Sequence, residues 1–225
     1  MEGKKLPIAV FVSGRGTNLQ SIIDAIEEGK LSAEIKLVVS NRSKAYALER
    51  CKKHGIPYRV IPSKRFENEQ EWGEALISAV KDSGAKLVVL AGFMRVVPTN
   101  FIEAFKNRII NIHPSILPSF KGLDAQGQAY RYGVTLTGCT VHIVTPELDA
   151  GPVIAQAVVP VLPNDTEETL AQRILKHEHR IYPQVIQWFA EGRIVVENGK
   201  VTVLGAKYGT LPFNPEPFNP ELEKF

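Results

Sequence analysis

The feature that most constrains the fold is an alternation of short apolar runs with helix-length amphipathic segments. Runs such as 8–12 and 87–91 consist almost entirely of Val, Ile, Leu, Ala and Phe, which is typical of strands covered on both faces. Alternation of this kind indicates βαβ units around a parallel sheet. We therefore predict an α/β fold, with a Rossmann-like, open, mostly parallel sheet and helices on both faces.

The same pattern places the individual elements. The expected strands are 8–12, 34–40, 58–61, 86–91, 109–112, 136–144 and 153–161. The expected helices are 18–29, 44–53, 67–82, 98–105 and about 167–191, the last capped by Thr166 or Asp165. The stretch 194–203, with Asn198-Gly199 in its middle, predicts a β-hairpin. Because prolines accumulate after Tyr208, we expect one domain at 1–207 and a proline-rich tail at 208–225.

Composition narrows the class of protein. A chain of 225 residues with 44% hydrophobic and 23% charged residues is an ordinary globular protein. Its net charge of +3 is too small to predict binding to nucleic acid or to a membrane surface, and no apolar run has the length of a membrane span. The start of the chain lacks the pattern of a cleavable leader, and the two cysteines cannot form a disulfide framework. We expect a cytoplasmic protein whose partners are small molecules, present as a monomer or homodimer.

A glycine-containing loop, Ser13–Asn18, joins the first strand to the first helix. Glycines allow a ligand to approach the backbone, and free amides at a helix start favour an anion such as phosphate. A dinucleotide fingerprint is disfavoured because Leu19 stands where a third glycine is needed, and a P-loop is excluded. The alternative is a tight turn in which Thr17 or Asn18 merely caps the helix.

Asn111 and His113 lie two residues apart on a predicted strand, so their side chains project to one face. Pro114 then ends the strand at its carboxyl end, where ligands bind in open parallel sheets. An amide donor beside an imidazole suits attack on a carbonyl carbon. Asp149, in a turn-rich loop after another apolar strand, could orient the imidazole. The alternatives are a structural histidine and a surface aspartate.

Other chemically active side chains are weaker candidates. Cys139 and His142 lie inside an apolar strand, where we expect a buried inert thiol and a structural histidine. Ser115 lacks the glycine-flanked turn of a hydrolase nucleophile. His, Cys, Asp and Glu nowhere show convincing zinc spacing, so we expect no metal.

Two motifs identify a family. Asn111–Pro118, followed by Glu147–Pro152, resembles the signature of the folate-dependent formyltransferases. The start, Val12–Gln20, is similar to the branch that acts on glycinamide ribonucleotide, as are Ala91–Arg95 and Glu178-His179. The resemblance covers about residues 6 to 196, and it implies transfer of the formyl group of 10-formyltetrahydrofolate to the glycyl amine of that ribonucleotide.

The resemblance also implies roles for individual residues. The implied catalytic residues are Asn111, His113 and Asp149. The implied ribonucleotide-binding residues are Gly16, Thr17 and Asn18 for the phosphate and Glu178 for the ribose hydroxyls. The implied folate-binding residues are Phe93, Met94, Arg95, Val96 and Val97, together with Glu147 and Leu148 in a loop that closes over the pterin.

The chain departs from the family pattern in three places. Ala150 replaces a glycine after the aspartate, Asp124 and Gln126 stand where many relatives carry histidines, and Leu175 replaces a glutamine that helps to hold phosphate. Phosphate binding is therefore expected to depend more on the first loop.

Three other functions remain as alternatives. A methionyl-tRNA formyltransferase would need an additional domain for tRNA, and a formyltetrahydrofolate hydrolase usually carries an additional N-terminal domain, whereas here the core is expected to begin at Ile8. A non-catalytic nucleotide- or folate-binding protein is the third.

Overall fold

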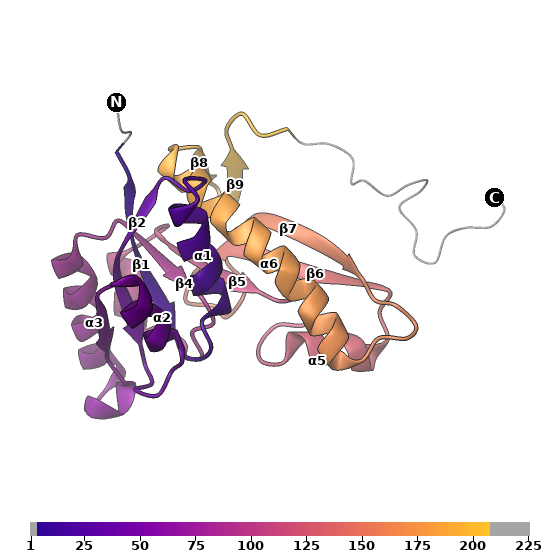
Figure 1. Cartoon of the computed structure of the whole chain (residues 1–225), viewed down its shortest axis with the longest axis horizontal. Helices are drawn as coiled ribbons and strands as arrows, with labels where there is room; N and C mark the ends of the chain where they lie inside the picture. The colour runs from indigo at the N-terminus through magenta and orange to yellow at the C-terminus, as the bar shows by residue number, and fades with distance from the viewer. Residues whose placement is uncertain (1–3, 208–225) are drawn as a thin grey trace.

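A seven-stranded sheet lies at the centre of the molecule, in the order β3-β2-β1-β4-β5-β6-β7 (Figure 1). The structure is a computed structural model in which residues 4–207 are described, so the tail predicted at 208–225 lies outside the described residues. The strands of this sheet are β1 (Leu6–Val12), β2 (Ala33–Ser40), β3 (Tyr58–Val60), β4 (Leu87–Leu90), β5 (Ile109–His113), β6 (Leu136–Ile143) and β7 (Val153–Pro160).

Helices cover both faces of this sheet. They are α1 (Thr17–Glu27), α2 (Ala47–His54), α3 (Glu69–Ser83), α4 (Thr99–Ala104), α5 (Ala125–Tyr132) and α6 (Glu167–Ala190), with a short 3-10 helix η1 at Ser63–Arg65. Strands β3, β2, β1, β4 and β5 run parallel, whereas β6 pairs antiparallel with both β5 and β7. The predicted mostly parallel α/β sheet is confirmed.

The sheet separates two apolar cores, because successive side chains of a strand point to opposite faces. On β1, Ile8 and Val10 join a core closed by α1, α2 and α6, whereas Ala9 and Phe11 join one closed by α3 and α4. Tyr182 of α6 is completely buried, and its hydroxyl lies 2.6 Å from the Leu90 carbonyl and 3.1 Å from that of Ile110. This side chain fixes α6 against the carboxyl end of β4 and the first residues of β5.

The order of the strands contains a switch point. From β1 the chain passes to β2 on one side and later to β4 on the other, so the direction of winding reverses between β1 and β4. Ligands bind at such switch points, outside the carboxyl ends of the strands. The segments 13–16, 91–98 and 114–124, which follow β1, β4 and β5, leave the sheet at this edge.

The predicted elements are present, with ends shifted by a few residues. Thr166 is the N-cap of α6. Its hydroxyl accepts a hydrogen bond from the Thr169 amide, and the Thr169 hydroxyl accepts one from the Thr166 amide. The predicted hairpin is β8 (Ile194–Glu197) and β9 (Lys200–Val203), with positive φ at the turn residues Asn198 and Gly199.

One helix, α5, was not predicted. Its sequence contains Gly127, a poor helix former, at a buried position where a Cβ would come within 2.4 Å of the Asp124 carboxylate. Its formation depends on this packing, which the local sequence does not reveal.

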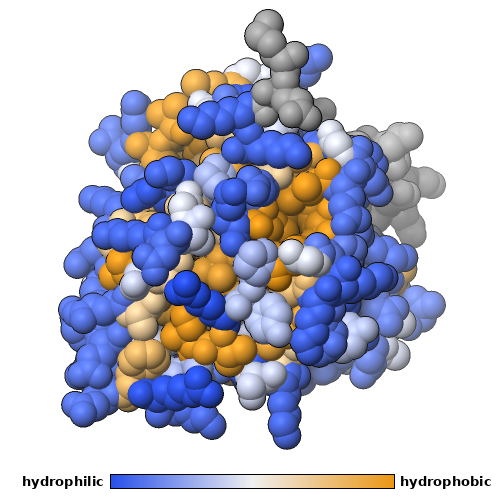
Figure 2. Space-filling view, turned by 60° about the vertical axis from the view of Figure 1, so that its left-hand side comes forward, coloured by the Kyte–Doolittle hydropathy of each residue, from blue (hydrophilic) through white to orange (hydrophobic). Residues whose placement is uncertain are grey.

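The surface is mainly polar on the face in Figure 2, and apolar surface is confined to patches between polar side chains. Across residues 4–207, no helix is long and apolar enough to cross a membrane.

Candidate active site

Asn111 and His113 lie at the carboxyl end of β5. Their neighbours Ile110 and Ile112 enter the core beneath α1 and α6, so the two polar side chains take the opposite face, as predicted. His113 is 5% exposed. Antiparallel pairing with β6 places His142 directly opposite Asn111.

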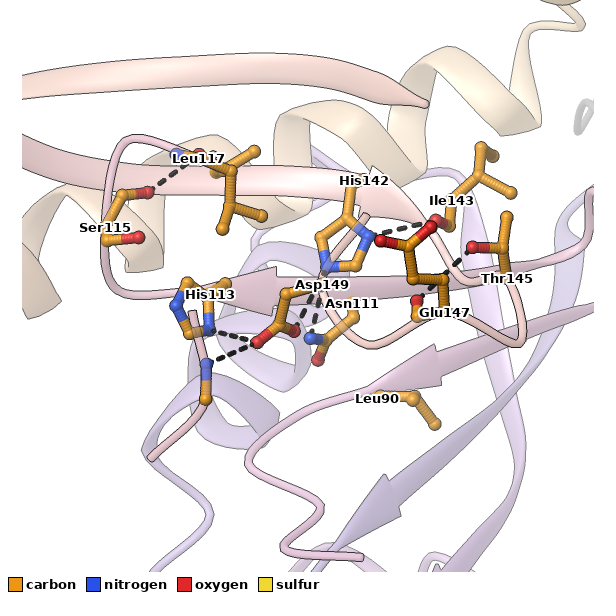
Figure 3. A network of polar contacts seen from close by, with 12 residues as sticks. Leu90, Asn111, His113, Ser115, Leu117, His142, Ile143, Thr145, Glu147 and Asp149 are labelled. Carbon is orange, nitrogen blue, oxygen red and sulfur yellow. Dashed lines mark hydrogen bonds and ion pairs between the residues drawn. The ribbon is translucent and has the colours of Figure 1, made fainter. Parts of the chain in front are cut away.

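The carboxylate of Asp149 reaches this pair from the loop between β6 and β7. Its Oδ2 lies 3.5 Å from His113 Nδ1 and accepts the Gly122 amide at 2.8 Å, and its Oδ1 lies 3.9 Å from His142 Nε2. Figure 3 shows Asp149 between His113 on one side and Asn111 with His142 on the other. Asp149 is not a surface group, because its side chain is only 8% exposed.

The ring of His113 faces an acceptor at each nitrogen. Nε2 is 2.8 Å from the carbonyl oxygen of Phe120 and therefore carries a hydrogen, while Nδ1 faces Asp149. Only the doubly protonated ring donates to both acceptors. Phe120 and Asp149 both have positive φ, of 52° and 48°, which are strained conformations for side-chain-bearing residues and are typical of functional sites. The geometry thus suits an imidazolium ion.

His142 is the residue whose place in the site was missed. Its Nδ1 is 2.9 Å from the Ile143 carbonyl, so this nitrogen carries a hydrogen. Burial lowers the pKa of His142, which favours a neutral ring whose Nε2 accepts from Asn111 Nδ2 at 3.3 Å. That bond uses one hydrogen of the Asn111 amide and leaves the other for a ligand. His142 is structural, as expected, but what it orients is Asn111.

The first loop ends in a helix start without a side-chain cap. Gly16 is the N-cap of α1 with φ 71°, and no side chain bonds the free amides, so the alternative of capping by Thr17 or Asn18 is wrong. A Cβ at Gly16 would lie 2.6 Å from that of Ala47, so only glycine fits. The amides of the first turn of α1 remain available for an anion.

Glu178 lies beside this loop although it comes from α6. It is 6% exposed and accepts a hydrogen bond from the side chain of Asn18, whose own Oδ1 is buried without a partner among the described residues. Burial raises the pKa of Glu178 to about 7, and the bond from Asn18 lowers it by less. Two of the residues expected to bind the ribonucleotide, Asn18 and Glu178, are thus in direct contact.

The segment expected to meet folate leaves β4 at the same edge. Phe93 packs on Phe11 and Trp72 and Val97 is buried, whereas Met94 and Val96 are 58% and 61% exposed. A pocket of about 360 Å³ is lined by Glu69, Arg95, Val96, Val97, Pro98 and Thr99. Arg95 forms an ion pair with Glu69 at 2.7 Å. Side chains of Met94 and Val96, together with main-chain groups, are what this segment offers a ligand.

The second segment expected to meet folate precedes Asp149. Leu148 is 54% exposed, and Glu147 lies 3.7 Å from the ammonium group of Lys121. The loop carrying them is thus next to the segment that follows β5, and both border Asp149.

The other weaker candidates, Cys139 and Ser115, do not join the site. Cys139 is buried, and burial raises the pKa of its thiol to about 12, so it stays protonated. The Ser115 hydroxyl donates to the Ser119 carbonyl at 2.6 Å. Asp124 pairs with Arg131 at 2.8 Å. Asp124 therefore supports α5 through Arg131, and Gln126 lies in the first turn of that helix.

Comparison with known proteins agrees with this geometry. The formyl transferase family model matches residues 6–186. The chain is 43% identical over 201 residues to the human trifunctional purine biosynthetic protein adenosine-3, covering 89% of this chain but 20% of that protein. It is 43% identical over 187 residues to the phosphoribosylglycinamide formyltransferase of Haemophilus influenzae, covering 83% of this chain and 88% of the relative. The chain thus spans a fifth or less of the length of the trifunctional relatives.

Solved structures give the same result. A glycinamide ribonucleotide transformylase from Symbiobacterium toebii superimposes with a TM-score of 0.87 at 47% identity, covering 90% of this chain and 95% of that one. A formyltetrahydrofolate deformylase from Pseudomonas syringae gives 0.83 at 30% identity, covering 90% of this chain and 67% of that one. The fold, the ordered site motifs and these matches together show that the chain belongs to the formyl transferase family.

Proposed function

We propose that the chain transfers the formyl group of 10-formyltetrahydrofolate to the glycyl amine of glycinamide ribonucleotide. The products are formylglycinamide ribonucleotide and tetrahydrofolate, a step of purine biosynthesis. The relatives whose names include this activity match the chain across most of its length.

The observation that carries the proposal is the cluster at the end of β5. Asn111 has an amide hydrogen to spare, His113 has two acceptors that suit its charged form, and Asp149 lies between His113 and His142. The amine that attacks belongs to the substrate, so no nucleophilic side chain is required. Free amides at α1 and the Asn18–Glu178 pair support a phosphorylated sugar as the carrier of that amine.

The reaction proceeds through a tetrahedral intermediate. The amine nitrogen attacks the formyl carbon, and the carbonyl electron pair moves to oxygen. The second hydrogen of Asn111 donates to this oxyanion, and the charge of the His113 imidazolium stabilises it. The amine loses a proton, which Asp149 accepts directly or through water. The electron pair of the oxyanion then re-forms the carbonyl, the bond between the formyl carbon and N10 breaks, and N10 takes up the proton from Asp149. Charge and protons balance without a metal ion in the scheme.

The test is an acceptor competition. Purified protein and 10-formyltetrahydrofolate are offered glycinamide ribonucleotide, water and charged initiator tRNA, and the formylated products are measured by mass spectrometry. We expect formylglycinamide ribonucleotide as the dominant product. Formate or formyl-methionyl-tRNA as the dominant product would contradict the proposal.

The second candidate function is hydrolysis of 10-formyltetrahydrofolate. The similarity to the deformylase favours it, because water could take the place of the amine at the same site. A water acceptor has no phosphate, however, and gives no reason for the free amides at α1 beside a buried Glu178. We therefore expect formate only as a minor product when the ribonucleotide is present.

A further inference from the structure

Ser13 joins the two substrate segments, a role that no sequence pattern predicts. It is the first residue after β1 and is 1% exposed. Its hydroxyl accepts the main-chain amide of Met94 at 2.7 Å and donates to the side-chain oxygen of Asn41, which follows β2, at 2.6 Å. A hydroxyl carries a single hydrogen, so the bond to Asn41 turns the oxygen lone pairs towards Met94.

The bond to Met94 matters because the segment around it has little other main-chain support. Within the described part of the chain, residues 92–97 take part in no hydrogen bond between main-chain groups. The segment is otherwise held by side chains, namely Phe93 on Trp72 and Arg95 on Glu69. The Ser13 hydroxyl is therefore the contact that ties this main chain to the loop leading into Gly16.

We propose that Ser13, oriented by Asn41, is a positioning residue that couples the two substrate sites. It holds the main chain that meets the formyl donor in a fixed place relative to the loop that binds the ribonucleotide phosphate. This inference rests on the proposed function, because it concerns the same two substrates. A shift of the reacting groups by about 1 Å can lower a rate by about 10²-fold, so a fixed spacing has a direct consequence for turnover.

Coupling of this kind has a thermodynamic signature. Each ligand binds more tightly when the other is present, by the same factor in both directions. Glycinamide ribonucleotide and the product tetrahydrofolate form a pair that cannot react, so the factor can be measured by titration calorimetry. We expect tetrahydrofolate to tighten ribonucleotide binding by about fivefold or more in the wild type.

The variants separate coupling from stability. Ser13→Ala is expected to bring the coupling factor close to one and to lower kcat about 10- to 100-fold, whereas Ser13→Thr, which keeps the hydroxyl, retains most of both. Asn41→Leu should reproduce the Ser13→Ala effect, and the double variant should add little to it.

Ser83 provides a matched control. Its hydroxyl also makes two bonds, to the Val80 carbonyl at 2.7 Å and from the Ala85 amide at 3.3 Å, but it lies at the end of α3, before β4 begins. Ser83→Ala should lower the melting temperature as Ser13→Ala does and leave the coupling factor unchanged.

Two results would overturn the inference. One is a wild type without coupling between the ligands. The other is Ser13→Ala with lower stability but unchanged coupling and kcat. Failure of the proposed function would be recognised separately, as a wild type that makes no formylglycinamide ribonucleotide while the binding titrations still report on the two sites.

Discussion

Asn111 presents one amide hydrogen to His142 and the other to the space at the end of β5. Removal of this amide takes away an oxyanion donor, and a lost donor costs about 10²–10³-fold in rate. We expect Asn111→Ala to lower kcat by this amount while the melting temperature falls only slightly, since one partly exposed hydrogen bond is lost. Single-turnover formyl transfer and thermal unfolding measure the two effects.

The control for Asn111 is Asn100→Ala, which removes an amide that bonds the Gln70 carbonyl at the α3–α4 contact. It should change stability and leave kcat within about twofold of the wild type. Near-normal turnover in Asn111→Ala would remove Asn111 from the catalytic group.

Glu178 makes binding and stability depend on pH. Its pKa rises from an ordinary value of 4.5 to about 7 in the folded protein, mainly because of burial. The folded state therefore keeps a proton that the unfolded state has lost, and stability falls as pH rises between these values, by up to about 3 kcal/mol. The loss is complete above the folded pKa and absent below 4.5.

Comparison of the wild type with Glu178→Gln tests this sign. The variant should be more stable than the wild type at pH 8 and equally stable at pH 4.5, as measured by urea unfolding. The KM of the wild type for the ribonucleotide should rise as pH falls through about 7, because the protonated acid accepts fewer hydrogen bonds. A stability difference that does not change with pH would show that Glu178 does not titrate in this range.

At the scale of single residues, part of the site could be predicted from the sequence. Asn111 and His113 share a strand, so the two-residue spacing places them on one face. His142 could not be assigned, because its contact with Asn111 depends on the antiparallel register of β5 and β6. The contacts of Ser13 and of the Phe120 carbonyl could not be predicted for a similar reason. Both involve loops whose paths no local pattern specifies.

At the scale of elements, the start of α1 depends on Gly16. Alanine there would need a left-handed φ and a Cβ overlapping Ala47. We expect Gly16→Ala to displace the loop and to raise the KM for the ribonucleotide at least tenfold, while the KM for the folate changes less. Steady-state kinetics with each substrate varied in turn measures the difference.

Gly29 is the matched control, because its φ of 70° is nearly the same and a Cβ added there would meet nothing within 4 Å. Gly29→Ala should carry the left-handed penalty alone, about 1–2 kcal/mol of stability, with normal kinetics. Equal KM values in the two variants would show that the first loop does not bind the ribonucleotide.

Helices and strands with a clear apolar period could be predicted, because the period follows from local geometry. Helix α5 could not. Gly127 lies against the Asp124 carboxylate, where no larger side chain would fit. Arg131 of this helix pairs with Asp124 and with Glu167 of α6, both at 2.8 Å. These are tertiary contacts, and they override a weak local preference.

At the scale of the whole molecule, the substrate segments come from distant parts of the chain because the winding of the sheet reverses between β1 and β4. Alternating elements predict a parallel sheet, but they do not fix the strand order. The antiparallel turn at β6 was also not specified, and it is what brings His142 and the loop of Asp149 to β5. The chemistry therefore depends on the least predictable part of the topology.

The placement of the site within the chain predicts where the functional domain ends. Every residue assigned to the site lies between Ser13 and Glu178, and the hairpin β8–β9 still contacts the core through Val196 and Val201. The side chain of Arg193 also donates a hydrogen bond to the Leu204 carbonyl at 2.6 Å. We propose that residues 1–207 form the catalytic domain and that residues 208–225 are dispensable for turnover.

Two truncations test this proposal by thermal unfolding and formyl transfer. A chain ending at Lys207 should keep its kcat and nearly its melting temperature, because the hairpin and its contacts with the core remain. A chain ending at Arg193 loses the hairpin, whose Val203 is 4% exposed, and it uncovers part of the core beneath α1 and α6. Since burial of a single aliphatic side chain is worth about 1.5–3 kcal/mol, this second chain should be clearly destabilised. Loss of turnover in the longer chain would move the domain boundary into the C-terminal segment.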